Sequence, residues 1–598
     1  MSSQPNLNSG AAIRIRAMLL LLLAGAGLGV SIASHGVAVA EPKQERKALK
    51  KAVVTKAKQI PPGQTALRQR AIIQKRFGPK SFTKSATVHP SNGAGALTKT
   101  SVTKTGVPKA GFTKTGFTKT GLSKTGLTKA GAAQPGLTKA GLARNPFTKA
   151  GRPATIGARL RLRADHRTQL LAARRLLPQR PYPGQRGFTG VPPVGETRFI
   201  STEMVLQVGP NVSRQAVEAA MARHGMTILA AQTSPITGGT IYQCRVAGGR
   251  QVVEAVRAFE AERFGTAQPN YVYLATQDQT RENASEDDTT LAARTDTGGS
   301  TDQYVISKLH LADVHRIATG NKVLVAVIDS AIDTRHPDLG GAIAEEFDAV
   351  GRRDPPHTHG TGMAGAIVAH RRLMGIAPGA RILAVHAFST SSQQTPEATT
   401  RNILAGIDWA IAKGARVINM SFAGPYDPML QVAMKNAAAK GVVLIAAAGN
   451  AGPKSPPLYP AADPNVIAVT ATDEHDKLFT QANQGPYVAV AAPGVDVTVP
   501  APNNTYQLTT GTSVAAAHVS GVAALLIERY PTVSAQTVLE VLTATAQKVG
   551  AGRNDQYGWG LIDPAAALDE LDVRMADSKV ATTARPPAAP KATPVSAR

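Results

Sequence analysis

Cysteine is nearly missing from this chain of 598 residues, which holds only Cys244. A single thiol excludes an intramolecular disulfide and any metal site built from several cysteines. Aromatic residues are scarce as well, at 4% of the sequence. So low a content is typical of a chain with long stretches that cannot form a hydrophobic core.

Long apolar runs are also rare, and the one candidate lies near the N-terminus. Arg14 and Arg16 precede an apolar stretch at 18–30, and the small-residue sequence Ala-Val-Ala follows at 38–40. This order is typical of a secretory signal peptide. We expect residues 1–40 to be a signal peptide and the protein to be secreted or periplasmic. The alternative is a membrane anchor that is not cleaved, because the apolar stretch nearly reaches the length of a bilayer span.

Acidic residues are scarce in residues 41–195, which hold 32 Lys and Arg against 3 Asp and Glu. The net charge of +27 therefore comes from this segment, since residues 303–571 hold 19 basic and 22 acidic residues. The regions able to fold are not basic. A globular nucleic-acid-binding protein, which the overall pI suggests, is therefore disfavoured.

A five-residue repeat with a central lysine runs through residues 97–151. A period of five matches neither a helix nor a strand, so no apolar face can form. We expect residues 41–195 to be a disordered basic arm, with a short helix at about 158–177. Such an arm could bind an anionic envelope surface or act as a solvated spacer. It lacks the interleaved aromatics that stack on bases, so we expect no specific nucleic acid partner.

Residues 196–275 alternate between strand and helix patterns. Strands are expected at 204–208, 227–231, 241–246 and 269–273, with helices after Ser213 and at 252–261. The order β-α-β-β-α-β predicts a small ferredoxin-like α+β unit.

Residues 303–571 read as buried strands separated by helices. Short apolar runs lie at 323–328, 380–385, 417–420, 442–446 and 466–469, and a helical pattern covers 398–413. Nearly continuous apolar strands of this kind predict an α/β fold, a parallel sheet covered by helices on both faces. Ligand sites in such sheets lie at the carboxyl ends of the strands.

Four polar residues are expected at those ends: Asp329, His359, Asn450 and Ser513. A serine becomes nucleophilic when a histidine takes its proton, and a carboxylate can orient that histidine. The asparagine amide can donate to a developing oxyanion. Taken singly, each residue has an ordinary explanation as a helix cap, a turn residue or a surface histidine. The combination, in the order Asp, His, Asn, Ser, is far more specific.

The sequence around these residues resembles the subtilisin-like serine proteases. The resemblance covers about residues 303–571 and is carried by Ile-Asp-Ser at 328–330, His-Gly-Thr at 359–361, Ala-Gly-Asn at 448–450, Gly-Thr-Ser at 511–513 and Tyr-Gly-Trp-Gly-Leu at 557–561. It implies a serine endopeptidase that hydrolyses proteins or peptides without a cofactor. By matched position, it also implies a catalytic triad of Asp329, His359 and Ser513, with Asn450 in the oxyanion hole.

The resemblance extends to the parts around the catalytic region. Residues 196–275 resemble the family's pro-domain, so a precursor that processes itself and binds its own pro-domain is implied. The family's substrate pocket maps to Ser421, Phe422, Ala423 and Leu458. Ala423 and Leu458 should make it shallow and apolar, which favours small or medium apolar residues before the cut bond. The segment 370–374 is shorter than the family's calcium loop, so we expect no metal.

Two further segments complete the predicted organisation. Residues 276–302 form an acidic linker, and residues 572–598 are expected to be a disordered tail. A single cut in the linker would separate the catalytic region from both arm and pro-domain, so attachment through the arm would be a property of the precursor. The alternative function is a weakly active or inactive envelope protein that binds through its basic arm.

Overall fold

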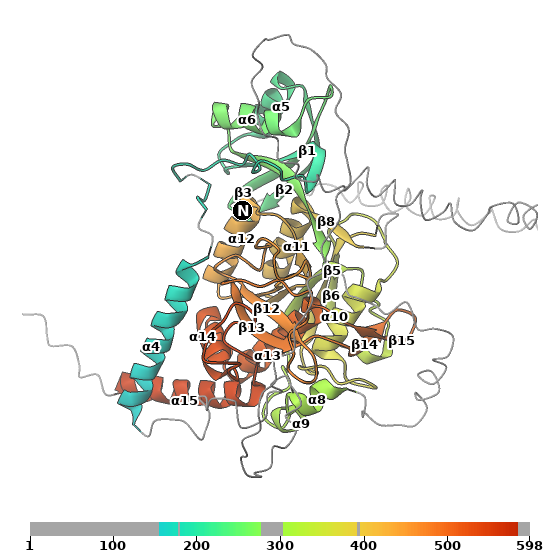
Figure 1. The fold of residues 1–598 in the computed structure, drawn as a ribbon. Coiled ribbons are helices and arrows are strands. Elements are labelled where there is room, and N and C mark those ends of the chain that lie inside the picture. The colour runs from blue at the N-terminus through green and yellow to red at the C-terminus, as the bar shows by residue number, and fades with distance from the viewer. Residues whose placement is uncertain (1–154, 178–179, 184, 277–302, 391–394, 584–598) are drawn as a thin grey trace, which may run out of the picture. The chain divides into compact units, whose positions relative to one another are not determined.

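The computed structural model describes residues 155–177, 180–183, 185–276, 303–390 and 395–583, all of which belong to one compact unit, 127–598 (Figure 1). The predicted signal peptide, the pentapeptide repeats and most of the acidic linker lie outside the described residues. Within the described residues, none of the helices combines the length and the apolar character needed to cross a bilayer.

A parallel sheet of seven strands lies at the centre of residues 303–583, which we call the α/β domain. The strand order is β13-β12-β11-β9-β5-β7-β6, and every neighbouring pair is parallel. These strands are β5 (Leu324–Ser330), β6 (Ile343–Asp348), β7 (Arg381–Phe388), β9 (Val417–Met420), β11 (Val443–Ala447), β12 (Ile467–Thr472) and β13 (Val488–Pro493).

Alternate residues of the sheet strands point into two different cores. Val325 and Val327 of β5 belong to one cluster, and Ala326 and Ile328 belong to the other. This two-residue period explains why the strands are apolar throughout, since both faces are covered by helices. The predicted α/β class with a two-sided parallel sheet is confirmed.

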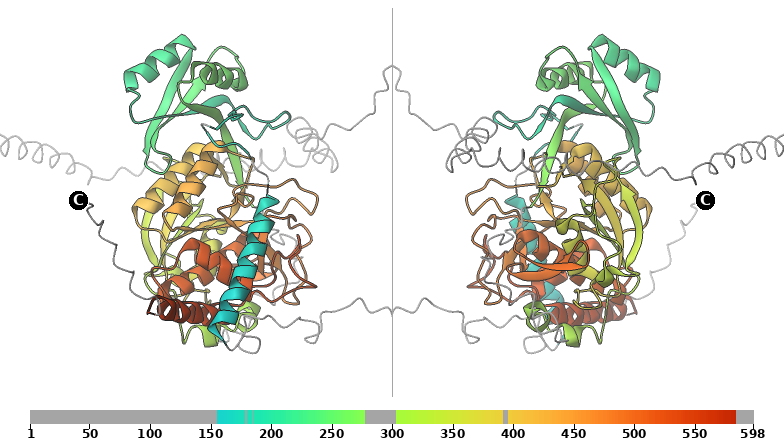
Figure 2. Two further views of the ribbon diagram at one scale, coloured as in Figure 1. Left: turned by 90° about the vertical axis from the view of Figure 1, so that its left-hand side faces the viewer. Right: turned by 90° about the vertical axis from the view of Figure 1, so that its right-hand side faces the viewer.

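Helices on each face complete the two cores (Figures 1 and 2). α10 (Thr358–Val368), α13 (Thr512–Arg529), α14 (Ala535–Thr545) and α15 (Pro564–Thr583) contribute to the first core, whereas α11 (Thr400–Ala412) and α12 (Pro428–Ala439) contribute to the second. The shorter elements of the α/β domain are α8 (Tyr304–Lys308), α9 (Leu311–Val314), η2 (Pro337–Leu339), β8 (Glu397–Thr399), β10 (Phe422–Ala423), β14 (Val497–Ala501) and β15 (Thr505–Thr509).

The N-terminal α+β unit comprises residues 199–276 and has its own core. Its elements are β1 (Phe199–Val208), α5 (Arg214–Arg223), β2 (Met226–Ser234), β3 (Gly239–Val246), α6 (Val252–Glu262) and β4 (Thr266–Ala275). The predicted β-α-β-β-α-β order is confirmed. Ser213 caps α5 as expected, because its hydroxyl accepts a hydrogen bond from the Ala216 N–H at 3.2 Å.

One sheet joins this unit to the α/β domain. Its strand order is β10-β4-β1-β3-β2, and β8 also pairs with β4. The last strand of the N-terminal unit therefore lies between two short strands of the α/β domain, and it is antiparallel to both.

Two expected boundaries are wrong. Part of the arm predicted to be disordered is helical and packed, since α4 (Ile156–Arg175) buries Leu170 in the first core. This helix agrees with the one predicted at 158–177. The tail predicted to be disordered from 572 instead continues α15 to Thr583, because Asp572 and Asp577 pair with Arg529 and Arg159.

Candidate active site

Asp329 and His359 meet at the carboxyl end of β5. Asp329 is the second-last residue of β5, and His359 lies in the first turn of α10, one residue after the helix begins. The His359 Nδ1 and Asp329 Oδ1 atoms are 2.7 Å apart, and both side chains are at most 5% exposed. A buried carboxylate bonded to Nδ1 fixes the imidazole so that proton exchange takes place at Nε2.

Ser330 holds the Asp329 carboxylate in place. Asp329 Oδ1 accepts the Ser330 N–H at 2.7 Å and the Ser330 hydroxyl at 3.1 Å. The Ser330 Oγ in turn accepts the Gly360 N–H at 3.0 Å, which ties β5 to the start of α10. A Cβ at Gly360 would collide with the Ser330 carbonyl oxygen, so a glycine is needed for this close approach.

Ser513 is the second residue of α13 and is fully buried in the precursor. Thr512, beside it, orients the side chain of Asn450. Asn450 Oδ1 accepts the Thr512 N–H at 3.1 Å and the Thr512 hydroxyl at 2.8 Å. These two bonds fix the orientation of the amide, whose Nδ2 is its hydrogen-bond donor.

The end of β4 reaches Ser513. The Ser513 hydroxyl lies 3.1 Å from the carbonyl oxygen of Thr276, the last residue described before the linker. The Ser513 and Thr276 hydroxyls also contact each other. The Thr276 N–H donates to the Ser421 carbonyl at 3.2 Å, and its hydroxyl donates to the same oxygen at 3.0 Å. A peptide carbonyl is thus held beside the serine.

Predicted substrate-binding residues line this peptide. Phe422 pairs with Ala275 and Ala423 pairs with Leu274, while β8 pairs with the other edge of β4. An extended peptide clamped between two antiparallel strands is bound through its backbone, so many sequences could occupy the same place.

Leu458 lies close to Gly449, beside Asn450. A Cβ placed on Gly449 would lie 3.1 Å from the Leu458 Cδ1, and Leu458 is largely buried. Its position next to the Asn450 segment agrees with its predicted place in the pocket.

Tyr273 fills a pocket further along the peptide. Its ring is fully buried and stands edge-on to Phe422 at 5.8 Å between centroids. Its hydroxyl donates to the Pro425 carbonyl at 3.3 Å, and its ring packs so closely on Gly424 that a Cβ there would collide with it. The peptide is therefore anchored by a large side chain three residues before Thr276.

A buried polar network fixes β4 on the α/β domain. The Asp427 carboxylate accepts the Gln268 amide at 2.8 Å and the Thr400 hydroxyl at 2.7 Å. Thr400 Oγ1 accepts the Tyr271 N–H, and Gln268 Oε1 accepts the Met429 N–H, both at 3.1 Å. Burial raises the pKa of Asp427, and these donors oppose that shift.

Comparisons with known proteins agree with this geometry. The sequence model of the subtilase family matches residues 320–560. Subtilisin DY of Bacillus licheniformis is 38% identical over 261 residues, a match that covers 42% of this chain and 91% of the relative. The chain belongs to the subtilase family. It is a serine endopeptidase that acts on proteins or peptides.

Matches to two other relatives cover between 45% and 66% of this subtilase. Thermitase of Thermoactinomyces vulgaris is 36% identical, with 45% of this chain and 96% of the relative covered. Fervidolysin from Fervidobacterium pennivorans, a keratinolytic enzyme related to subtilisin, matches in structure with a TM-score of 0.54 and 25% identity. That match covers 66% of this chain and 64% of fervidolysin, just under two thirds of its length.

Two departures from the family's motifs have structural explanations. A second histidine is common at the position of Gly362, but here a Cβ would lie 2.9 Å from Val499 Cγ2 of β14. The second departure is the short segment 370–374. Its Arg372 donates its backbone N–H to the Asp338 carboxylate at 2.6 Å. Among the described residues no cluster of three His, Cys, Asp or Glu side chains could hold a metal ion.

Several residues that position the site were missed in the sequence. Ser330, Thr512 and Thr276 were not singled out, although each lies within a few residues of a recognised motif or predicted strand end. Asn419 was also missed; its amide donates to Ser421 Oγ, which donates to the Ser513 carbonyl, both at 3.0 Å. Ser330 and Thr512 lie inside the motifs quoted above, and Asn419 lies two residues before Ser421, whereas Thr276 has no signal beyond the predicted strand end before it.

Proposed function

We propose that this subtilase is a secreted, self-processing endopeptidase in which Ser513 is the nucleophile. Its hydroxyl oxygen attacks the peptide carbonyl carbon while His359 Nε2 takes the hydroxyl proton. The bond of Asp329 to Nδ1 supports the imidazolium that forms. His359 then returns the proton to the leaving amine. A water molecule next attacks the acyl carbon while His359 takes its proton, and His359 passes that proton to the Ser513 oxygen as the acyl group leaves.

The Asn450 amide stabilises the negative oxygen of the tetrahedral intermediate. Thr512 engages Oδ1, which presents Nδ2 as the donor, and the backbone N–H of Ser513 at the start of α13 is the second donor. Donors oriented before the reaction cost no reorganisation when charge develops on the oxygen.

Self-cleavage takes place between Thr276 and Gln277. The observation that carries this is the 3.1 Å approach of Ser513 Oγ to the Thr276 carbonyl oxygen, with the Thr276 N–H bound to Ser421. The cut falls at the start of the acidic linker. After it, β4 still fills the cleft between β8 and β10, so the N-terminal α+β unit acts as a pro-domain and inhibits the enzyme it came from.

Secretion is supported by the signal-like residues 1–40, and a related protein of Bacillus subtilis is described as a minor extracellular protease. The leader would be removed during export, before the linker is cut.

A serine-directed fluorophosphonate probe tests the proposed chemistry. Processed enzyme should be labelled at Ser513 and lose activity in step with labelling, whereas the Ser513→Ala variant should take up no probe. Labelling that persists in the variant, or activity that survives full labelling, would reject Ser513 as the nucleophile.

A further inference from the structure

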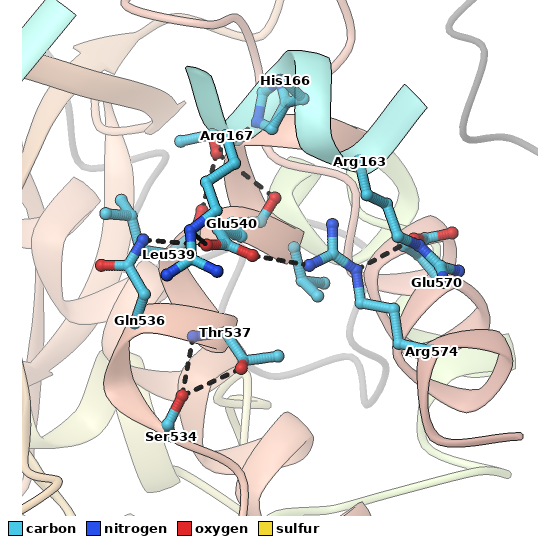
Figure 3. A network of polar contacts seen from close by, with 12 residues as sticks. Arg163, His166, Arg167, Ser534, Gln536, Thr537, Leu539, Glu540, Glu570 and Arg574 are labelled. Carbon is cyan, nitrogen blue, oxygen red and sulfur yellow. Dashed lines mark hydrogen bonds and ion pairs between the residues drawn. The ribbon is translucent and has the colours of Figure 1, made fainter. Parts of the chain in front are cut away.

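Helix α4 carries cations at four-residue spacing along one face. Arg159, Arg163 and Arg167 lie one helical turn apart and reach carboxylates of α14 and α15; the first two are largely covered, whereas Arg167 is more than half exposed. Arg161 is exposed. Residues spaced by four align along a helix, so the three guanidinium groups form one basic row. Figure 3 shows Arg163 and Arg167 of this row beside Glu540, Glu570 and Arg574 of the α/β domain.

Asp577 of α15 receives two of these arginines. Arg159 binds it with both Nε and Nη2, at 3.1 and 2.6 Å, and Arg163 Nη1 lies 2.7 Å from it. The Asp577 side chain is 4% exposed. Hydrogen bonds from Arg159 and Arg163 hold the pKa of Asp577 below its ordinary value, against the opposing effect of burial.

The ion pairs continue along both helices. Arg163 Nε and Arg574 Nε share Glu570 Oε1, at 2.9 and 3.0 Å. Arg574 also reaches Glu540 of α14 at 3.0 Å, and Arg167 lies 3.4 Å from the same carboxylate. Positive and negative groups therefore alternate along the interface, and Figure 3 shows the part of it that contains Arg163, Arg167, Glu540, Glu570 and Arg574.

Apolar contacts anchor the same face of α4. The His166 ring stands edge-on to Trp559, with centroids 4.6 Å apart, and its Nε2 lies 3.0 Å from the Thr543 hydroxyl. Leu170 is 3% exposed within the main core cluster. A helix held only by surface charge would not bury these two side chains.

The surface under α4 is acidic in its own right. Arg574 of the α/β domain pairs with Glu540 and Glu570, whereas the printed ion pairs of Asp577 are with Arg159 and Arg163 of α4. Because a buried carboxylate is costly when a partner is taken away, this surface favours a cationic segment such as α4. Both α4 and α15 lie outside residues 320–560, which the family model matches.

The chain stays on the α/β domain after α4. The Arg180 guanidinium lies 4.5 Å from the centre of the Tyr426 ring, and Lys435 Nζ lies 4.7 Å from the centre of the Tyr182 ring. Farther on, Gly190 touches the backbone of Ala267 in β4, where a Cβ would not fit. The chain between α4 and β1 therefore contacts the α/β domain at Arg180 and Tyr182 and contacts β4 at Gly190.

We propose that the acidic face of α14 and α15, defined by Glu540, Glu570 and Asp577, is a docking site for α4 that is separate from the substrate cleft. This docking site keeps the segment that ends at Thr276 on the α/β domain after the peptide bond between Thr276 and Gln277 is cut. The second statement rests on the proposed self-cleavage. Two linked contacts must open together for release, so dissociation is much slower than from the cleft alone.

With α4 docked, a single cut in the linker does not separate the α/β domain from the basic N-terminal residues. After removal of the leader, residues 41–154 still precede α4 in the chain, so they stay with the α/β domain while α4 is docked. Attachment of the enzyme through its basic N-terminal residues then outlasts the first cleavage, contrary to release by a single cut. Release of α4 becomes a separate step in activation.

The test uses the full-length Ser513→Ala precursor with the recognition sequence of a foreign protease inserted between 277 and 302 and an affinity tag at its C-terminus. After cutting on a column, the N-terminal segment should remain bound and leave slowly on washing. Arg159→Glu with Arg163→Glu should raise the rate of loss at least tenfold. Arg161→Glu, the matched control on the exposed face, should leave the rate within twofold.

Leu170→Ala provides a second arm that changes no charge and should also raise the rate of loss. If the variant with both Arg159→Glu and Arg163→Glu does not fold, the Leu170→Ala variant alone tests the docking site. Equal rates in the parent and the Leu170 or double-arginine variants would overturn the docking site. No step needs Ser513, so failure of self-cleavage in the wild-type chain would reject the proposed function and leave this result standing.

Discussion

The hydroxyl of Ser513 lies 3.1 Å from the carbonyl oxygen of Thr276, although 237 residues separate the two in sequence. The contact arises because β4 inserts between β8 and β10 and ends at the N-terminus of α13. The chain thus places its own backbone beside Ser513.

Replacing Asn450 with Ala should lower kcat by about 100- to 1000-fold with little change in KM. The size of the effect is the one established for the oxyanion asparagine of a subtilisin, a member of this family. The physical reason is that a donor in the oxyanion hole binds most strongly when negative charge has developed on the oxygen, which happens after attack. Steady-state kinetics on a peptide substrate, with thermal unfolding as the folding control, would check this. Near-normal turnover would show that Asn450 has another role.

The residue before the cut bond should be small or of medium size. Leu458 lies against Gly449 and Ala423 adds a methyl group, so we expect a shallow pocket, and Thr276 is itself small. A peptide-library profile of the mature enzyme should favour residues such as Ala, Thr, Val and Leu. A profile led by Phe, Tyr or Lys would contradict this description of the pocket.

Docking of α4 should weaken as the pH falls. Burial lowers the pKa of His166 from 6.5 to about 4, with a smaller contribution from Arg574 in the same direction. Glu540 opposes the shift and Lys548 adds to it. A lowered pKa means that the docked state prefers the neutral ring, so stability is complete above pH 6.5 and is lost as the pH falls towards 4.

The size of this effect can be measured in the cut Ser513→Ala precursor. At pH 5 the docking equilibrium should be about 30-fold weaker than at pH 8, from the two pKa values. His166→Gln is the control, since glutamine can bond to Thr543 but does not titrate in this range. The rate of loss should rise at low pH much more in the parent than in this variant. The same rise in both would show that other groups cause it.

Cys244 should be unreactive in the folded precursor. It is fully buried in the core of the N-terminal α+β unit, and burial raises its pKa to about 12. A thiol that stays protonated and covered reacts slowly with alkylating reagents. At pH 8 we expect no labelling under native conditions and complete labelling in denaturant, as read by mass spectrometry. Fast native labelling would mean that the unit opens readily.

Much of the fold was predictable because its signals are local. The strands of the central sheet are short apolar runs, and most fall within a residue or two of their predicted limits; β11, expected at 442–446, is Val443–Ala447. β13 (Val488–Pro493) was missed although it is apolar. Two other missed strands have weak patterns. β6 carries Glu345 and Glu346, and β10 has two residues whose pairing depends on β4.

The sequence predicts residues for the candidate site but not the segment that lies against Ser513. Motif order pointed to Asp329, His359 and Ser513, yet nothing in the local sequence of Thr276 marks it as the residue that meets Ser513. The docking of α4 was hidden for a similar reason. Arg159 and Arg163 look like part of a basic arm until Glu570 and Asp577, more than 400 residues away, are brought beside them.

The identity of the first processed bond tests the central claim most directly. Purified wild-type precursor should yield a fragment whose new N-terminus is Gln277, as read by mass spectrometry or N-terminal sequencing, and the Ser513→Ala precursor should stay intact in parallel. Cleavage elsewhere as the first event, or the same cleavage in the Ser513→Ala chain, would contradict the account.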